Sequence, residues 1–154
     1  MVQHLLADTL RSQLKFKESE DLFSKTLLKR ENGLGADHLD SVHTRYGLCL
    51  VFEDTDWIQE AEEQCSMALE SRKKQIFDDK DPLLLRYRNS LANFWRKQGK
   101  LIEAEKSQAE ILELPQQVLG PKALDTLHTK HLLSLTLETL KKYKEAAKIA
   151  RENH

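Results

Sequence analysis

The feature of this sequence that most constrains its fold is a short segment that recurs at a nearly constant interval. In each copy a predicted tight turn is followed by a large apolar residue, an acidic residue and a small residue. The small positions are Ser19, Ala61, Ala104 and Ala146, which lie 42, 43 and 42 residues apart. A fixed period of this size is typical of repeat solenoids, in which each unit buries its apolar face against its neighbours.

The pattern of apolar residues predicts an all-α chain of eight helices in four antiparallel pairs. Leu6, Leu10 and Leu14 recur at the spacing of an amphipathic helix, and no segment alternates as a strand would. The predicted helices are 2–13, a helix from the Lys15-Phe16 turn to about Gly33, 40–54, 57–76, 82–98, 101–117, 125–140 and 143–153.

These pairs predict a single array over residues 1–154. The predicted repeats are 1–33, 34–76, 77–118 and 119–154, of which the first lacks its lead-in and the last is cut short. Asp81 directly precedes Pro82 and is therefore a predicted N-cap, since proline suits the first helical position. Pro115 is predicted to kink its helix or end it early.

A second set of small residues precedes the first by 12 positions. This set is Ala7, Cys49, Ala92 and Ser134. A small residue on each of two antiparallel helices lets the backbones approach closely, while larger residues fill the space around them. The two sets therefore predict the contact at the centre of each helix pair.

Composition excludes several classes of function. A net charge of −1 with 32% charged residues argues against a nucleic-acid binder, and no apolar run is long enough to span a membrane. The two cysteines, Cys49 and Cys65, form neither a disulfide framework nor a set of metal ligands. These features predict a cytoplasmic protein.

The chain resembles the tetratricopeptide repeat family in its long, 42-residue form. The resemblance rests on the spacing of small residues, on Leu91-Ala92 followed by Gln98–Glu105, and on Leu119-Gly120-Pro121 leading into Leu124–Leu127. The linker is similar to those of kinesin light chains and of repeat arrays in fungal and bacterial nucleotide-binding, receptor-like proteins. The resemblance implies a right-handed α–α solenoid that binds peptides or acts as a scaffold.

The sequence departs from the kinesin light chain pattern at two kinds of position. Those repeats often carry a pair of asparagines on the first helix, whereas this chain has only Asn89, with Tyr46 and His131 at equivalent places. Leu39 and Leu124 also stand where the linker proline is expected.

In a solenoid of this kind the first helix of each pair lines the concave face. The predicted groove residues are His43, Tyr46, Arg86, Asn89, Asn93, Arg96, Lys97, His128 and His131. Arginines can hold a carboxylate with two hydrogen bonds, and asparagine amides can hold a peptide backbone. The sequence therefore predicts a groove for an extended or short helical peptide with an acidic residue near Arg86 and Asn93. The alternative interpretation is an ordinary solvated helix face.

Other functions have weaker support in the sequence. His128 and His131 are spaced to share a metal ion, but no further ligands are evident, so neither a metal nor a cofactor is predicted. No nucleophile–base set or phosphate loop is present, which predicts a non-enzymatic chain with protein or peptide partners. The competing role is a scaffold or oligomerisation segment that self-associates through uncapped ends. Trp57 is a predicted exposed residue of unassigned function.

Overall fold

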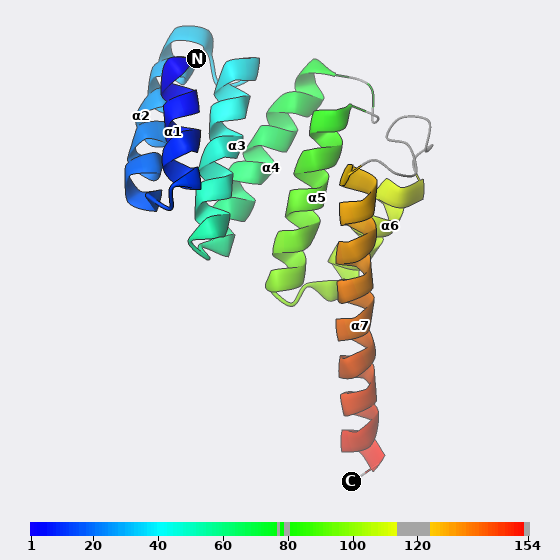
Figure 1. The fold of residues 1–154 in the computed structure, drawn as a ribbon. Coiled ribbons are helices and arrows are strands. Elements are labelled where there is room, and N and C mark those ends of the chain that lie inside the picture. Colours follow the sequence, from blue (N-terminus) through cyan, green and yellow to red (C-terminus); the bar gives the residue numbers. More distant parts are fainter. Residues whose placement is uncertain (77, 79–80, 114–123, 153–154) are drawn as a thin grey trace. The chain divides into compact units, whose positions relative to one another are not determined.

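The computed structural model describes residues 1–76, 78, 81–113 and 124–152, and this part of the chain is all-α (Figure 1). The helices are α1 (Val2–Ser12), α2 (Phe16–Leu34), α3 (Leu39–Asp54), α4 (Ile58–Gln75), α5 (Pro82–Lys97), α6 (Leu101–Glu113) and α7 (Leu124–Glu152). The predicted fold class is confirmed, and the first six helices begin within two residues of their predicted starts.

The chain forms two compact units, Met1–Tyr87 and Arg88–His154, whose boundary falls within α5. In the first unit α1 packs on α2, α2 on α3 and α3 on α4, the sequential contacts expected of stacked helix pairs. Its core holds five buried residues, with Phe16, Leu22 and Phe52 packed around them. These core residues are Ala7, Phe23, Leu27, Leu48 and Val51. In the second unit α6 packs on α7.

The small residues predicted at the helix contacts are buried in the first three pairs. Ala7, Ser19, Cys49, Ala61, Ala92 and Ala104 are all fully buried. In the first pair the hydroxyl of Ser19 donates a hydrogen bond of 2.7 Å to the carbonyl of Ala7. A small side chain on each helix is therefore compatible with close contact between the two backbones.

Within the described residues the turn between paired helices is made in one way. At the end of α3, Asp56 adopts a left-handed φ of 62°. Its N–H donates to the carbonyl of Glu53, and the N–H of Trp57 donates to the carbonyl of Phe52. These two bonds define a Schellman motif, which satisfies the last carbonyls of a helix. Leu14 and Gly99 occupy the same place after α1 and α5, at φ values of 61° and 81°.

Trp57 has a structural role in its turn. Its ring stacks on that of Phe52, with centroids 6.4 Å apart and planes inclined by 15°. An apolar contact between these two positions commonly accompanies a Schellman motif. The exposed tryptophan therefore covers the end of α3, although 58% of its surface remains accessible.

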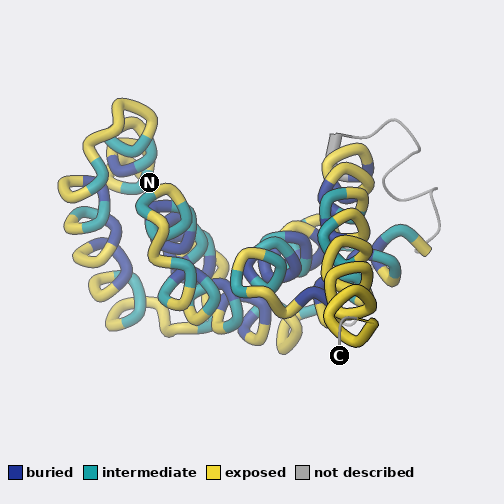
Figure 2. The backbone as a smooth tube through the Cα atoms, turned by 90° about the horizontal axis from the view of Figure 1, so that it is seen from below, coloured by how far each residue is buried: buried dark blue, intermediate teal, exposed yellow. Residues whose placement is uncertain are grey.

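The prediction of eight helices is wrong, because the described part of the chain has seven. Residues 125–140 and 143–153 were predicted to be separate helices, but α7 runs unbroken from Leu124 to Glu152 (Figure 1). The small positions Ser134 and Ala146 consequently lie on one helix, and both are exposed. In Figure 2 the turns of α7 near the C-terminus are coloured as exposed.

The residues at the predicted fourth turn favour a continuous helix. Lys141 stands where Leu14, Asp56 and Gly99 adopt positive φ, but lysine is a good helix former. Salt bridges at helical spacing also span the site, from Lys142 to Glu138 at 3.2 Å and from Lys141 to Glu145 at 4.0 Å. All side chains from 141 to 152 are exposed, so little tertiary packing opposes this local preference.

The helix ends partly match prediction. Asp81 caps α5 as predicted, since its carboxylate accepts a 3.2 Å hydrogen bond from the N–H of Leu84. At the start of α3 the N-cap is His38, whose Nδ1 accepts a hydrogen bond from the N–H of Asp40. Pro115 and the predicted end of the third pair lie outside the described residues.

Candidate protein-interaction surface

The first helices of the first unit carry a row of polar residues that interact with one another. On α1, His4 lies 3.7 Å from Asp8, and Arg11 lies 3.6 Å from the same carboxylate. Arg11 also donates a 2.8 Å hydrogen bond to Asp54 on α3. These contacts link the polar faces of α1 and α3 and fix the direction of the side chains along them.

His43 continues this row on α3. Burial lowers its pKa below the usual value, and the positive charges of Arg72, Arg30 and Arg86 lower it further, against an opposing effect of Asp40. Its Nε2 atom is buried and makes no hydrogen bond within the described residues. The imidazole is therefore neutral near pH 7 and lies among cationic groups.

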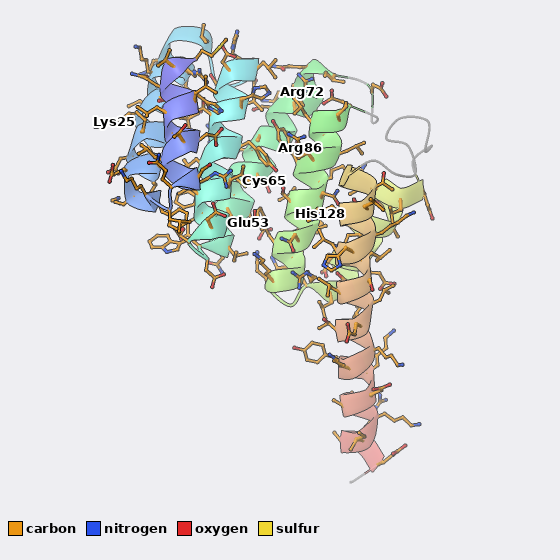
Figure 3. The ribbon with its side chains drawn as sticks, viewed as in Figure 1. Lys25, Glu53, Cys65, Arg72, Arg86 and His128 are labelled. Carbon is orange, nitrogen blue, oxygen red and sulfur yellow. The ribbon has the colours of Figure 1, made fainter. Side chains whose placement is uncertain are left out.

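Tyr46 and Arg86 lie beside this histidine in the first unit. The ring of Tyr46 contacts that of Tyr87, with centroids 4.7 Å apart. Tyr87 is fully buried, which raises the pKa of its phenol to about 12, and its backbone carbonyl accepts a hydrogen bond from Cys65. Arg86 is exposed, and Figure 3 labels its position on α5. Buried aromatic packing thus fixes the backbone that carries an exposed guanidinium.

An ion pair positions the start of α5. Arg72 on α4 donates hydrogen bonds of 3.0 and 3.1 Å to the two carboxylate oxygens of Asp81. The pair with Arg72 holds the pKa of Asp81 below its usual value. Because Asp81 also caps α5, this pair connects α4 to the helix that carries Arg86.

In the second unit Asn89 is largely buried. It is 6% exposed, and its amide donates a 2.5 Å hydrogen bond to the hydroxyl of Thr129 on α7. Its side-chain carbonyl is buried without a partner within the described residues. The amide of Asn89, a predicted groove residue, therefore serves the contact between α5 and α7.

The other predicted residues of the second unit are accessible to varying degrees. Asn93 and Arg96 are half-buried, and the guanidinium of Arg96 donates a 3.0 Å hydrogen bond to the amide oxygen of Asn93. Lys97, His128 and His131 are exposed, and Figure 3 labels His128 on α7. The structure therefore brings Asn93 and Arg96 together.

The sequence pattern did not indicate the buried ion pair of the first unit. Arg45, only 7% exposed, pairs with Glu31 on α2 and donates a 2.9 Å hydrogen bond to Gln64 on α4. This side chain joins three consecutive helices. Only the spatial proximity of Glu31 and Gln64 reveals its role.

The described residues contain no group of three or more histidine, cysteine, aspartate or glutamate side chains that could hold a metal ion. Among the same residues, no helix is long and apolar enough to cross a membrane. Cys49 and Cys65 are free and fully buried.

Comparisons with known proteins agree on the family. Two profiles described as tetratricopeptide repeat match residues 83–152 and 1–40. A solved structure of kinesin light chain nearly identical TPR-like repeats from Podosopora anserina is similar, with a TM-score of 0.81 at 18% identity. The alignment covers 98% of this chain and 71% of that one. None of the curated proteins matches.

A second solved structure, BtubC (BKLC) from P. vanneervenii, gives a TM-score of 0.79 at 14% identity. That alignment covers 96% of this chain and 58% of the other. The chain is thus a helical repeat protein of the class whose folds serve protein–protein interaction or scaffolding. It belongs to the tetratricopeptide repeat family and resembles the kinesin light chain-like members in fold.

Proposed function

We propose that this chain is a non-enzymatic interaction module that binds an extended or short helical peptide carrying an acidic residue. The peptide lies along the first helices of the repeats. The residues assigned to it are His43, Tyr46, Arg86, Asn93, Arg96, Lys97, His128 and His131. Asn89 is left out because its amide is buried against Thr129.

The observation that carries this proposal is the environment of Arg86. Its guanidinium is exposed and lies close enough to His43 to affect the pKa of that imidazole. Arg72, by comparison, is engaged by Asp81. A guanidinium on a fixed helix can receive a carboxylate through two parallel hydrogen bonds. Rigid support also reduces the entropy lost on binding.

A second group of donors, Asn93 and Arg96, lies on the part of α5 that belongs to the second unit. Arg96 donates to Asn93, so the two side chains are already oriented toward one another. We assign Asn93 to the peptide backbone and Arg96 to positioning it, because an amide group can donate and accept at once.

Selection from a library of short random peptides tests this function. We expect enrichment of peptides with aspartate or glutamate at one fixed position. An Asn93→Leu variant is expected to lose affinity for the selected peptides, whereas Asn32→Leu on an exposed part of α2 is the matched control. Selection without acidic enrichment, or equal affinity of both variants, would contradict the proposal.

The alternative function is a scaffold or self-associating segment of a longer array. It is favoured by the second half of α7, where Tyr143 and Ile149 are 63% and 57% exposed. Sedimentation at several concentrations distinguishes the two, since a strict monomer counts against self-association. We place the protein in the cytoplasm, a location with which two free, buried cysteines are compatible.

A further inference from the structure

The second unit has a hollow between α6 and α7 that the proposed function does not use. Its volume is about 360 Å³. The lining residues are Glu105 on α6 and Leu137, Leu140, Lys141, Lys144, Glu145 and Lys148 on α7. Successive residues turn by 100° around a helix axis, so this row lies on a different side of α7 from His128 and His131. The hollow is therefore a separate surface.

The apolar part of the hollow includes a repeat position that the second helix covers in the other helix pairs. Leu137 is equivalent by the repeat spacing to Leu10, Phe52 and Trp95, which are half-buried. Those residues precede turns after which a second helix packs back on the first. Because α7 continues straight, Leu137 remains 44% exposed. The repeat geometry thus leaves uncovered a place where a helix packs in the other pairs.

The charge of this surface indicates what kind of helix fits it. Residues 141–152 contain four lysines and one arginine against two glutamates, whereas the whole chain has a net charge of −1. Lys144 makes no ion pair within the described residues. Lys148 lies 3.8 Å from Glu152, but both side chains are mostly exposed, and such pairs are weak and readily exchanged.

We propose that this hollow docks an amphipathic helix of a partner protein. The apolar stripe of that helix packs on Leu137 and Leu140, and its acidic residues face Lys144 and Lys148. Helix-in-groove recognition combines these two features: apolar anchors recur at helical spacing, and charges fix the register. The partner helix takes the place that a second helix occupies in the other repeats.

A synthetic peptide with the sequence of residues 101–113 is a suitable probe. It is the second helix of the preceding repeat and carries four glutamates and one lysine, and Arg88 on the first helix of that repeat donates a 3.3 Å hydrogen bond to its Glu110. In the intact chain Leu101, Ala104 and Ile111 are buried, so the protein does not present this helix itself. Binding of the fluorescent peptide to the full chain is measured by anisotropy.

Leu137→Glu is expected to weaken binding about tenfold, because it removes an apolar anchor of the interface. Tyr143→Glu, on another side of α7, is the matched control and should bind like wild type. The double variant Lys144→Glu, Lys148→Glu should bind the acidic probe more weakly. It should bind more tightly a probe whose glutamates are replaced by lysine. Circular dichroism verifies that each variant keeps its helices.

Three results would overturn the proposal. Equal affinities of Leu137→Glu and Tyr143→Glu would show that the apolar anchor is not used. If the double lysine variant prefers the same probe as wild type, charge recognition is excluded. Concentration-dependent dimers that Leu137→Glu abolishes would identify a second copy of this chain as the occupant. Because Arg86 and Asn93 are unchanged in these variants, failure here leaves the proposed peptide site standing.

Discussion

The ring of Phe23 on α2 lies against the backbone of α3 at Gly47. A Cβ atom placed on Gly47 would lie 2.4 Å from Cε1 and 2.6 Å from Cζ of Phe23. Phe23 is fully buried, so its ring has little freedom to move aside. A glycine in the middle of α3 would ordinarily weaken the helix, and here it permits the contact between consecutive repeats.

We expect Gly47→Ala to destabilise the protein by about 1–3 kcal/mol, the usual cost of overpacking a core. Urea unfolding followed by circular dichroism measures this difference. Gly33→Ala is the matched control, since nothing lies within 4 Å of a Cβ there. Replacing Phe23 by leucine in the Gly47→Ala chain should recover part of the loss. A neutral Gly47→Ala would show that the two helices separate easily.

The residues with left-handed backbone in the turns predict that introducing a glycine there stabilises the protein and that removing one destabilises it. Leu14 has a φ of 61°, a conformation that costs a non-glycine residue about 1–2 kcal/mol. Leu14→Gly should therefore stabilise the protein by about 1 kcal/mol, and Gly99→Ala should destabilise it similarly. Space is open around Gly99, so its backbone conformation alone causes the loss. Thermal melts that move both variants in the same direction would refute the role assigned to these turns.

The pair between Arg72 and Asp81 predicts a pH-dependent contribution to stability. The pKa of Asp81 is lower in the folded chain than the usual 3.8, so folding favours the ionised form. The resulting stability is present above about pH 4 and is lost as the pH falls through the folded pKa. Asp81→Asn keeps a good N-cap but removes the charge, and we expect a cost of about 1–2 kcal/mol at pH 7.

Urea unfolding at several pH values tests this contribution. The difference between wild type and Asp81→Asn should shrink as the pH falls from 7 toward 3. Asp56→Asn, in the turn before α4, is a control that changes the same charge without an Arg72 partner. A difference that is constant over the whole pH range would exclude an ionic contribution from Asp81.

The continuous α7 predicts a specific distance along the helix. Ser134 and Ala146 are separated by about 18 Å if the helix is unbroken, at a rise of 1.5 Å per residue. Spin labels at these two exposed positions should report a separation near that value. A distance below about 10 Å, the spacing of packed helix axes, would show instead that residues 143–152 fold back on the first half of α7.

The repeat period was sufficient to predict most of the fold. Ala7 and Ser19, or Ala92 and Ala104, are fully buried because each helix pair needs two small residues where its backbones approach. Such requirements recur in every unit and are therefore visible in one sequence. Asp81 was likewise recognisable as a cap from the proline that follows it.

The fourth turn could not be predicted from its position in the repeat. Leu14 adopts a left-handed conformation although leucine seldom does, because tertiary packing of α1 on α2 requires it. Lys141 occupies the equivalent place without such packing, and its helix propensity prevails. The period records where a turn belongs, but packing determines whether the turn forms.

The candidate site was predictable only in part. Asn89 and Asn93 share a side of α5 by helical spacing, yet Asn89 is buried against Thr129 and Asn93 is half-buried. Each first helix contacts a neighbouring repeat as well as the second helix of its own pair. The pattern of residues along one helix does not indicate which of them face the neighbouring repeat. For the same reason the role of Arg45, which contacts residues of α2 and α4, could not be predicted from the sequence.

The most direct test of the account compares Arg86→Glu with Arg88→Glu. Both variants reverse one charge on α5, but Arg88 lies on another side of the helix and pairs with Glu110 at 3.3 Å. With an acidic peptide from the library selection, we predict that Arg86→Glu weakens binding by about tenfold or more, while Arg88→Glu binds like wild type. Equal affinities of the two variants would contradict the account.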